Sequence, residues 1–355
     1  MSQPTENNQA APIGPDLYPE LDEPWHAVAG KHFPGLAFAF LIAAISLFVS
    51  GQYGGPVMLY ALLVGMVFSY LSEDGRWLPG IAFAGRSVLR LGVALLGSQI
   101  MLSDFLALGP MPIFLVVSGV AFTILAGTLI GRIVGLDLAC SILSAGAVAI
   151  CGASAALAIS AVLPMKGNKE GQTLLIIVGV TALSTVAMVL YPVIASALGF
   201  SLQETGLFIG ATIHDVAQVV GAGYMVSPET GDTATMVKLM RVACLAPVVM
   251  IIGLTFRKET GDLTGKSPPI LPPFLIWFCV LVAVNSLNLL PSGIRDLTGD
   301  VSRWCLIAAV AAIGAKMSPK EMLAPGPRPL AALSVQTVAL AGFAIVVIFS
   351  TRMMV

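Results

Sequence analysis

Long uninterrupted stretches of apolar residues dominate the chain, separated by short connections rich in Gly and Pro. A helix needs about 20 predominantly apolar residues to cross the hydrocarbon core of a bilayer. By that criterion the sequence predicts an all-α polytopic membrane protein with about 10–11 transmembrane helices. The eleven segments that meet it are 34–50, 56–71, 82–103, 110–133, 138–163, 172–198, 203–226, 233–256, 271–290, 300–317 and 328–350.

Composition excludes several classes of protein. Of the 355 residues, 57% are hydrophobic and only 10% are charged, whereas an average soluble domain has about 25% charged residues. The net charge of −1 and the absence of a basic tract give no reason to expect a nucleic-acid partner. The 5 cysteines form no C-x-x-C pair, and there is no Walker A loop, so we expect no metal, no cofactor and no direct use of ATP.

The first part of the chain differs in character from the rest. Residues 1–33 are polar and rich in Pro, and they lack a basic stretch followed by an apolar core. We expect a flexible cytoplasmic N-terminal tail over 1–33 and a transmembrane domain over 34–355.

Lys and Arg residues predict the orientation, because cytoplasmic loops carry an excess of them. A cytoplasmic N-terminus and a periplasmic C-terminus place eleven on the inner side and five on the outer side. Lys166 and Lys169 run against this bias, and a segment 138–163 that dips into the membrane and returns would be another way to place them. The expected location is the bacterial inner membrane.

One stretch is echoed later in the chain. "GSQIMLSDFLALGPMP" at 97–112 resembles "GAKMSPKEMLAPGPRP" at 314–329. The two lie seven predicted segments apart, and an odd separation gives them opposite membrane orientations. This is the mark of an inverted repeat, although two simple five-helix repeats would place them five segments apart.

Small residues interrupt the segment 138–163. In "AICGASAALAIS", Gly152, Ala153 and Ser154 stand near the middle of the bilayer. They allow close helix packing, or they break the helix. A break would expose backbone N–H groups that, with the helix dipole, favour an anion, and such backbone is tolerated only beside a protein-lined cavity.

Polar residues interrupt a second segment, "GLFIGATIHDVAQVVGAGYM". If 206–225 is one helix, His214 and Gln218 share a face with Asp215 close by. An ionisable residue inside a span marks a functional site by default, although a His–Asp pair could also lock two helices together. Gly221 and Gly223 predict where this helix would break.

Two cations, Lys238 and Arg241, follow in "VKLMRV". They either extend to the membrane surface or need partners inside the protein. Asp215 and an anionic substrate are the candidates, since Arg offers a planar fork for oxyanions and Lys a compact charge.

Together, these motifs resemble those of the YeiH-type sulfate exporter family, which is grouped with cation/proton antiporters and bile-acid symporters. The similarity runs from about residue 34 to the C-terminus. It implies inverted repeats, discontinuous crossing helices, and a core domain that moves against a panel domain. It also carries over the motif positions Cys151–Ala156, His214, Asp215 and Gln218.

The sequence thus predicts a secondary transporter that exports a small anion, most simply sulfate, with His214 and Asp215 coupling transport to a proton or Na⁺. Its expected partners are the lipid bilayer, the anion, the coupling ion and a second copy in a homodimer. The alternatives are a cation-coupled transporter of an organic anion, a cation antiporter with no sulfate role, and a channel. An enzyme using Cys151 as nucleophile is not expected, because an apolar setting disfavours the thiolate. The predicted substrate-binding residues are Cys151, Gly152, Ala153, Ser154, Thr212, Gln218, Lys238 and Arg241.

Overall fold

The computed structural model describes residues 25–54, 56–73, 75–103, 109–164, 169–260, 273–316 and 327–352, and this part of the chain contains helices and no strand. The predicted all-α polytopic class is therefore confirmed. α1 already begins at Trp25, and residues 1–24 of the predicted tail lie outside the described residues. The elements are α1 (Trp25–Tyr53), α2 (Val57–Val67), the 3₁₀ turn η1 (Ser69–Glu73), α3 (Leu78–Phe83), the π-helix η2 (Ala84–Val88), α4 (Leu89–Leu96), α6 (Met111–Val134), α7 (Leu138–Ala149), α8 (Ala153–Val162), α9 (Lys169–Ala197), α10 (Leu202–Thr212), α11 (Val216–Val226), α12 (Pro228–Ala243), α13 (Leu245–Thr260), α14 (Pro273–Ser286), α15 (Ser292–Ala315) and α17 (Pro327–Arg352).

Seven helical stretches of the described chain are long and apolar enough to cross a membrane. They are α1, the continuous run α3–η2–α4, α6, α9, the run α12–α13, α15 and α17. The shorter apolar helices α2 and α14 lie beside them. These helices make the chain a multi-pass membrane protein, and the two predicted segments that remain, 138–163 and 203–226, have a different form.

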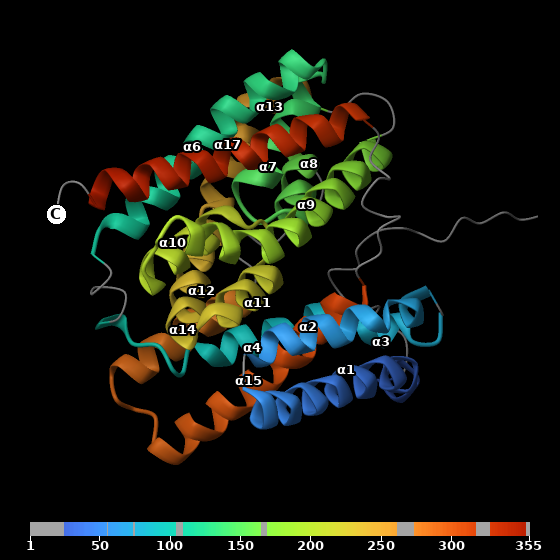
Figure 1. Cartoon of the computed structure of the whole chain (residues 1–355). Helices are drawn as coiled ribbons and strands as arrows, with labels where there is room; N and C mark the ends of the chain where they lie inside the picture. The colour runs from blue at the N-terminus through green and yellow to red at the C-terminus, as the bar shows by residue number, and fades with distance from the viewer. Residues whose placement is uncertain are drawn as a thin grey trace, which may run out of the picture.

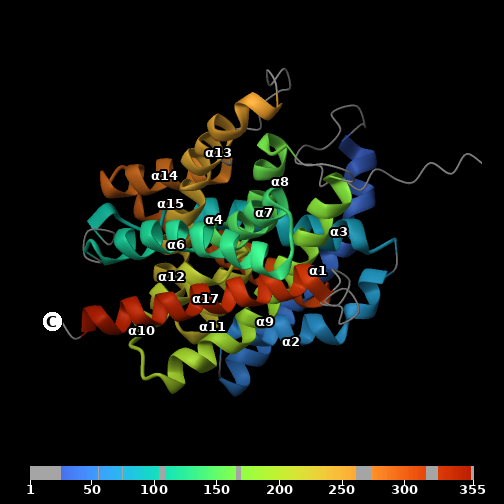
Figure 2. The ribbon, with the colours of Figure 1, turned by 90° about the horizontal axis from the view of Figure 1, so that it is seen from above.

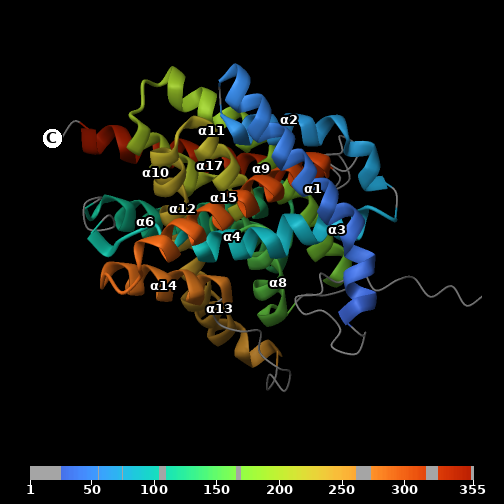
Figure 3. The same cartoon turned by 90° about the horizontal axis from the view of Figure 1, so that it is seen from below.

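The helices form two layers (Figure 1). One layer, here called the panel, consists of α1, α2, α3–η2–α4, α14 and α15, and it is seen face-on in Figure 3. The other, here called the core, consists of α6 to α13 and α17, with α6 and α17 side by side (Figure 2). Helix α11 joins the layers by packing on α2 and α15.

Within the panel, α1 and α3 touch backbone to backbone. A Cβ atom on Gly35 would lie 2.2 Å from the carbonyl oxygen of Trp77, and one on Gly80 would lie 2.2 Å from that of His32. Small residues at such crossings let membrane helices associate through van der Waals contact, since lipid provides no hydrophobic driving force.

The segment 138–162 is a re-entrant hairpin, here called hairpin A. A Cβ atom on Gly146 of α7 would lie 2.3 Å from Cδ1 of Ile159 in α8, although these positions would be about 20 Å apart along one straight helix. Cys140, at the start of α7, also bonds to Gln172, at the start of α9 (3.3 Å). The chain therefore enters through α7 and returns through α8 to the end of the bundle where it entered.

The segment 202–226 is a second re-entrant hairpin, here called hairpin B. Along α12, Gly206 packs on Thr233 and Gly210 on Val237, so α10 runs parallel to α12. Gly223 packs on Gly231, so α11 runs back toward the start of α10. Because α9 begins at the entrance of hairpin A and ends just before α10, hairpin B enters from the opposite end of the bundle.

These contacts reveal an inverted repeat whose two copies are ordered differently. Each hairpin is followed by a long crossing helix, α9 after hairpin A and α12–α13 after hairpin B. The sequence echo adds two further matches, α4 with α15 and α6 with α17. The two helices of each matched pair also pack against one another. In the first copy the hairpin follows these helices, whereas in the second it precedes them. This order explains why the two echoed stretches lie seven segments apart. Residues 104–108 and 317–326, which belong to these stretches, lie outside the described chain.

The hairpins also change how the basic residues are placed. The start of α9 at Lys169 lies on the same side of the molecule as the start of α1, and the C-terminal helix ends on the other side (Figure 1). Lys169 therefore lies on the side where most of the basic residues are expected. This is the placement predicted by the alternative in which the segment 138–163 dips into the membrane and returns. Lys166 lies outside the described residues.

A crosslink tests hairpin A. In a background without the other four cysteines, Gln172→Cys should crosslink to Cys140 through a short bis-maleimide, because the two side chains touch at the entrance of the hairpin. The readout is an intramolecular adduct detected by mass spectrometry. Ser196→Cys, exposed at the other end of α9, paired with Cys140 gives the background level, and a continuous crossing helix over 138–163 would leave 140 and 172 unlinked.

Candidate functional site

The tips of the two hairpins meet in the interior of the core. Hairpin A turns at residues 150–152 and hairpin B at residues 213–215. A Cβ atom on Gly152 would lie 3.6 Å from the Cβ of His214. The helix break predicted at the small residues after Cys151 is present, and Gly152 itself has φ 62° and ψ −116°.

Lys238 and Arg241 hold the tips together. Their side chains are 0% and 1% exposed. The Lys238 ammonium donates to the carbonyl oxygens of Ile150 (2.6 Å) and Ile213 (2.9 Å), one from each tip. Both cations therefore lie within the protein and do not extend to the membrane surface.

The Arg241 guanidinium donates five hydrogen bonds. Nε and Nη2 donate to Ala149 (3.0 and 2.7 Å), Nη2 also to Val148 (2.8 Å), and Nη1 to Ala211 (2.6 Å) and Ile213 (3.2 Å). All acceptors are backbone carbonyl oxygens at the C-terminal ends of α7 and α10, where the helix dipoles are negative. An anion could contact Arg241 directly only if one of these bonds were given up.

His214 also holds the tip of hairpin B in place. Its side chain is fully buried, with Nδ1 3.1 Å from the carbonyl oxygen of Val148 and Nε2 3.0 Å from Oγ1 of Thr337. Because both ring nitrogens have partners, neither faces Cys151. The Cys151 thiol instead accepts a hydrogen bond from the Ser154 hydroxyl (2.8 Å).

Each hairpin has a first arm, α7 or α10, and a second arm, α8 or α11. The second arms begin at the tips, and their N-termini differ. Helix α8 starts after Gly152 without a side-chain cap. Helix α11 starts at Asp215, whose carboxylate accepts from the amide of Ala217 (2.8 Å). Ala153, Ser154 and Asp215 are half-buried, whereas the residues just before them are buried. One helix N-terminus is therefore open to an anion and the other carries its own negative charge.

Two predicted features of 206–225 are wrong. The helix breaks at residues 213–215, and α11 continues unbroken through Gly221 and Gly223. Consequently His214 and Gln218 do not share a helical face, because His214 lies in the turn. The amides of His214 and Asp215 donate to the Ser184 hydroxyl (both 3.1 Å), which substitutes for the missing helical bonds.

The other predicted residues are placed around the tips. Thr212 is buried and bonds to the carbonyl oxygen of Phe208 in its own helix. Gln218 donates to Thr185 (2.7 Å), and its buried Oε1 has no hydrogen-bond partner among the described residues. Asp215 interacts electrostatically with Lys238 but forms no ion pair with Lys238 or Arg241 in this part of the chain.

Comparison with known proteins identifies the family. A family model described as "Conserved hypothetical protein 698" matches residues 34–333. The UPF0324 membrane protein TauZ of Paracoccus pantotrophus is 50% identical over 323 residues, which cover 90% of this chain and 96% of the relative. A UPF0324 membrane protein of Chlorobaculum tepidum is 48% identical over 88% of this chain and 87% of its own length.

The chain belongs to the UPF0324 membrane protein family. The resemblance drawn from the motifs around Gly152 and His214 is thereby confirmed at the level of the family. No solved structure matches the chain significantly.

Sequence reasoning did not find three residues that support the UPF0324 site. Ser184 and Thr185 lie in the middle of α9, and Thr337 lies in α17. Each hydroxyl bonds to hairpin B, and each is nearly or fully buried. Their signal in the sequence is a polar pair in the middle of an apolar span, "ST" in α9 and "QT" in α17.

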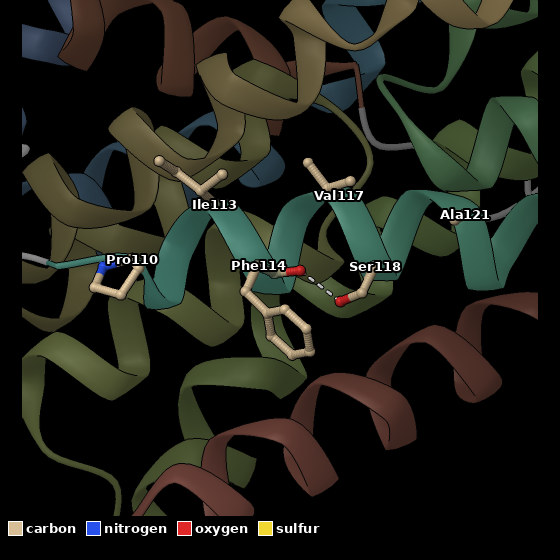
Figure 4. Close-up of a pocket in the computed structure, with 6 residues that line it drawn as sticks. All are labelled: Pro110, Ile113, Phe114, Val117, Ser118 and Ala121. Carbon is tan, nitrogen blue, oxygen red and sulfur yellow. Dashed lines mark hydrogen bonds between the residues drawn. The ribbon is translucent and has the colours of Figure 1, made fainter.

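Two cavities of the UPF0324 structure are lined by no residue of the tips 150–152 and 213–215. One is an apolar groove on α6, lined by Pro110, Ile113, Phe114, Val117, Ser118 and Ala121 (Figure 4). Its one hydroxyl, on Ser118, bonds to the carbonyl oxygen of Phe114, and Ile113, Phe114 and Val117 are exposed as expected of a lipid-facing surface. This groove offers no group that would recognise an ion.

Removing Arg241 should destabilise the protein strongly. Arg241→Met leaves the carbonyl oxygens of Ala149 and Ala211 without the side-chain donor that they have in this structure, at a cost of about 3–5 kcal/mol. Arg241→Lys should fall between Arg241→Met and wild type, because an ammonium has three donors rather than five. Thermal unfolding in detergent measures the effect. Arg352→Gln, which removes the exposed ion pair with Glu204, should cost no more than about 1 kcal/mol.

Gly152→Ala should also destabilise the fold, by about 1–3 kcal/mol, because the backbone angles at the tip are strained for a residue with a Cβ atom. Gly342→Ala is the control, since it lies in α17 and its Cβ atom would contact nothing within 4 Å. The same melting experiment should show Gly342→Ala at or above the wild-type stability. Equal stabilities for the two variants would contradict the strained tip.

Proposed function

We propose that this UPF0324 protein is a secondary transporter of a small oxyanion, with sulfate the first candidate. The observation that carries the proposal is the uncapped N-terminus of α8 at the tip of hairpin A, inside the protein and partly accessible. Backbone N–H groups and the helix dipole favour an anion at such an end. The Ser154 hydroxyl, which donates to the Cys151 thiol in this structure, would turn to donate to the anion.

The buried cations support an anion at the tips without binding it. Lys238 and Arg241 compensate the negative ends of α7 and α10, which would otherwise repel an anion at the neighbouring N-terminus of α8. In this role they set the electrostatic potential of the site and the position of its amides. The direct ligands proposed are the amides of Ala153 and Ser154 and the Ser154 hydroxyl.

Asp215 is the proposed coupling group. Its carboxylate begins the second arm of hairpin B, is partly accessible, and interacts with Lys238 across the tips. A negative charge there disfavours an anion nearby, so binding of a proton or Na⁺ by Asp215 would favour anion binding. His214 positions this tip through its two hydrogen bonds and is not assigned a proton.

The alternative of a cation-coupled transporter without a sulfate role is favoured by one observation. The Oε1 atom of Gln218 is buried without a hydrogen-bond partner in the described chain, one helical turn from Asp215. An amide oxygen and a carboxylate are ligands suited to a hard cation. An enzymatic role for Cys151 is not proposed, because His214 is engaged elsewhere.

Orientation follows from the charge bias. We place the end where hairpin A enters, which carries the start of α1, in the cytoplasm of a bacterial inner membrane. The C-terminus is then periplasmic, and each hairpin reaches the tips from one side of the membrane. Alternating access to a site between inverted repeats is the expected mode of transport.

Sulfate flux into proteoliposomes tests the proposal. Wild-type protein should transport radiolabelled sulfate under an imposed gradient. Ser154→Asp should abolish flux while retaining stability, because its carboxylate would occupy the N-terminus of α8 and complement the dipole. Ser160→Ala, on the same arm and bonded to its own helix, should transport as wild type. The proposal would be contradicted if the wild-type protein transported no oxyanion, or if Ser154→Asp transported sulfate at the full wild-type rate.

A further inference from the structure

The sulfur of Cys151 lies directly beside the groups proposed to bind the oxyanion. The Ser154 hydroxyl donates to this sulfur over 2.8 Å and is 3.4 Å from the Cys151 carbonyl oxygen. The backbone N–H of Ala155 hydrogen-bonds to the same sulfur. The thiol therefore accepts from one group that the proposed function assigns to the anion, and from an amide next to it.

These donors belong to a helix end that needs an acceptor. The first helical bond of α8 joins the amide of Ala156 to the carbonyl oxygen of Gly152 (2.9 Å). Helix geometry leaves the preceding amides, at residues 153–155, without an intrahelical acceptor. A side-chain oxygen of the N-cap residue usually fills this role, but the N-cap here is Gly152, which has no side chain. The sulfur of the residue before it takes over part of that role.

The backbone on both sides of the sulfur is held in place. The carbonyl oxygen of Ile150 accepts a hydrogen bond from a side chain of α12 (2.6 Å), and the amide of Gly152 donates to Ala147 (2.9 Å). Cys151 itself is only 4% exposed. The group that can change partners is therefore the Ser154 hydroxyl, which is half-buried and turns about a single bond.

The chemistry of the acceptor suits such an exchange. A thiol sulfur is a weak hydrogen-bond acceptor, whereas a hydrogen bond to an ionised oxygen is roughly twice as strong as one between neutral groups. A thiol at position 151 can thus accept from the Ser154 hydroxyl in the empty protein and lose this bond when an oxyanion arrives. A carboxylate at the same position would hold the hydroxyl against the anion.

We propose that Cys151 sets the affinity of the oxyanion site: its sulfur holds the Ser154 hydroxyl while the site is empty, and the anion competes with the sulfur for that hydroxyl. The inference rests on the proposed function. When the anion binds, the hydroxyl turns from the sulfur to an anion oxygen, and the amides of Ala153 and Ser154 complete the contact. The Ala155 amide keeps the sulfur as its acceptor.

This exchange limits how tightly the site binds. Every anion must displace an internal acceptor, so its binding is weakened by the hydrogen bond that is given up. When the anion leaves, the hydroxyl returns to the sulfur, and the empty site keeps no unpaired buried donor, which would be unfavourable. Both effects help a transporter to release its anion after it has crossed the membrane.

Sulfate binding by purified protein in detergent tests the inference. Cys151→Ala should lower the Kd for radiolabelled sulfate by about threefold to fivefold, because one neutral hydrogen bond no longer has to be given up. A packing role alone would leave the Kd unchanged or raise it, so the sign of the effect separates competition from packing. Cys305→Ala is the matched control: this cysteine is equally buried, lies in α15 of the panel, and should be replaceable without a change in Kd.

The exchange also predicts that the effect depends on Ser154. In the Ser154→Ala background, which lacks the hydroxyl, Cys151→Ala should leave the sulfate Kd unchanged, since nothing remains to compete for. An equal lowering of the Kd in both backgrounds would overturn the competition. So would an unchanged or raised Kd in a folded Cys151→Ala variant.

Infrared spectroscopy follows the thiol directly. In protein whose other four cysteines are replaced by Ala, the S–H stretching band of Cys151 should shift when sulfate is added, because the sulfur then accepts one hydrogen bond fewer. The same addition to the Ser154→Ala variant should leave the band nearly in place. Absence of a shift at a sulfate concentration that saturates binding would overturn the inference.

The outcomes separate the two proposals. If wild-type protein binds sulfate and a folded Cys151→Ala variant binds it with the same Kd, the inference fails and the proposed function stands. If wild-type protein binds neither sulfate, sulfite, thiosulfate nor phosphate, both fail. Should Cys151→Ala not fold, as judged by size-exclusion chromatography, the infrared measurement, which keeps the thiol, decides.

Discussion

The whole core depends on one constraint: the carbonyl groups that end α7 and α10 lie inside the protein and need donors. A helix that ends in the hydrocarbon region leaves its last carbonyl groups unpaired, at a cost of several kcal/mol each. Lys238 and Arg241, one turn apart on α12, donate to both ends. A single crossing helix thereby allows two hairpins from opposite sides of the membrane to end face to face.

The same arrangement makes the tips unequal. The C-terminal ends of both first arms are compensated alike, but one second arm begins with an open N-terminus and the other with a carboxylate. Inverted repeats place equivalent backbone in opposite orientations, and the sequence then gives each copy a different charge. Binding and coupling can therefore be assigned to different hairpins.

The sequence predicted much of the architecture and less of the site. Segment lengths and hydropathy gave the class and most helices, and the small residues around Gly152 gave the first break. That the chain returns after the break has no local signal, because the arms of a hairpin and the halves of a crossing helix look alike in hydropathy. The second break, at Ile213, His214 and Asp215, contains no Gly or Pro and depends on Ser184 for its bonds. Lys238 and Arg241 were recognised as needing partners, but backbone carbonyl groups cannot be read from side-chain identity.

The reversed order of the repeats has a consequence for biogenesis. Both hairpins leave the ribosome before the helix that pairs their ends, and Thr337, which bonds to His214, lies in α17, a helix that is synthesised later still. The nascent core must therefore persist in the translocon or lipid with unpaired tips until α12 arrives, and it closes only after synthesis of α17. A chain truncated before α17 would present an incompletely bonded tip to membrane quality-control proteases, so assembly of the core is completed only when α17 packs on it.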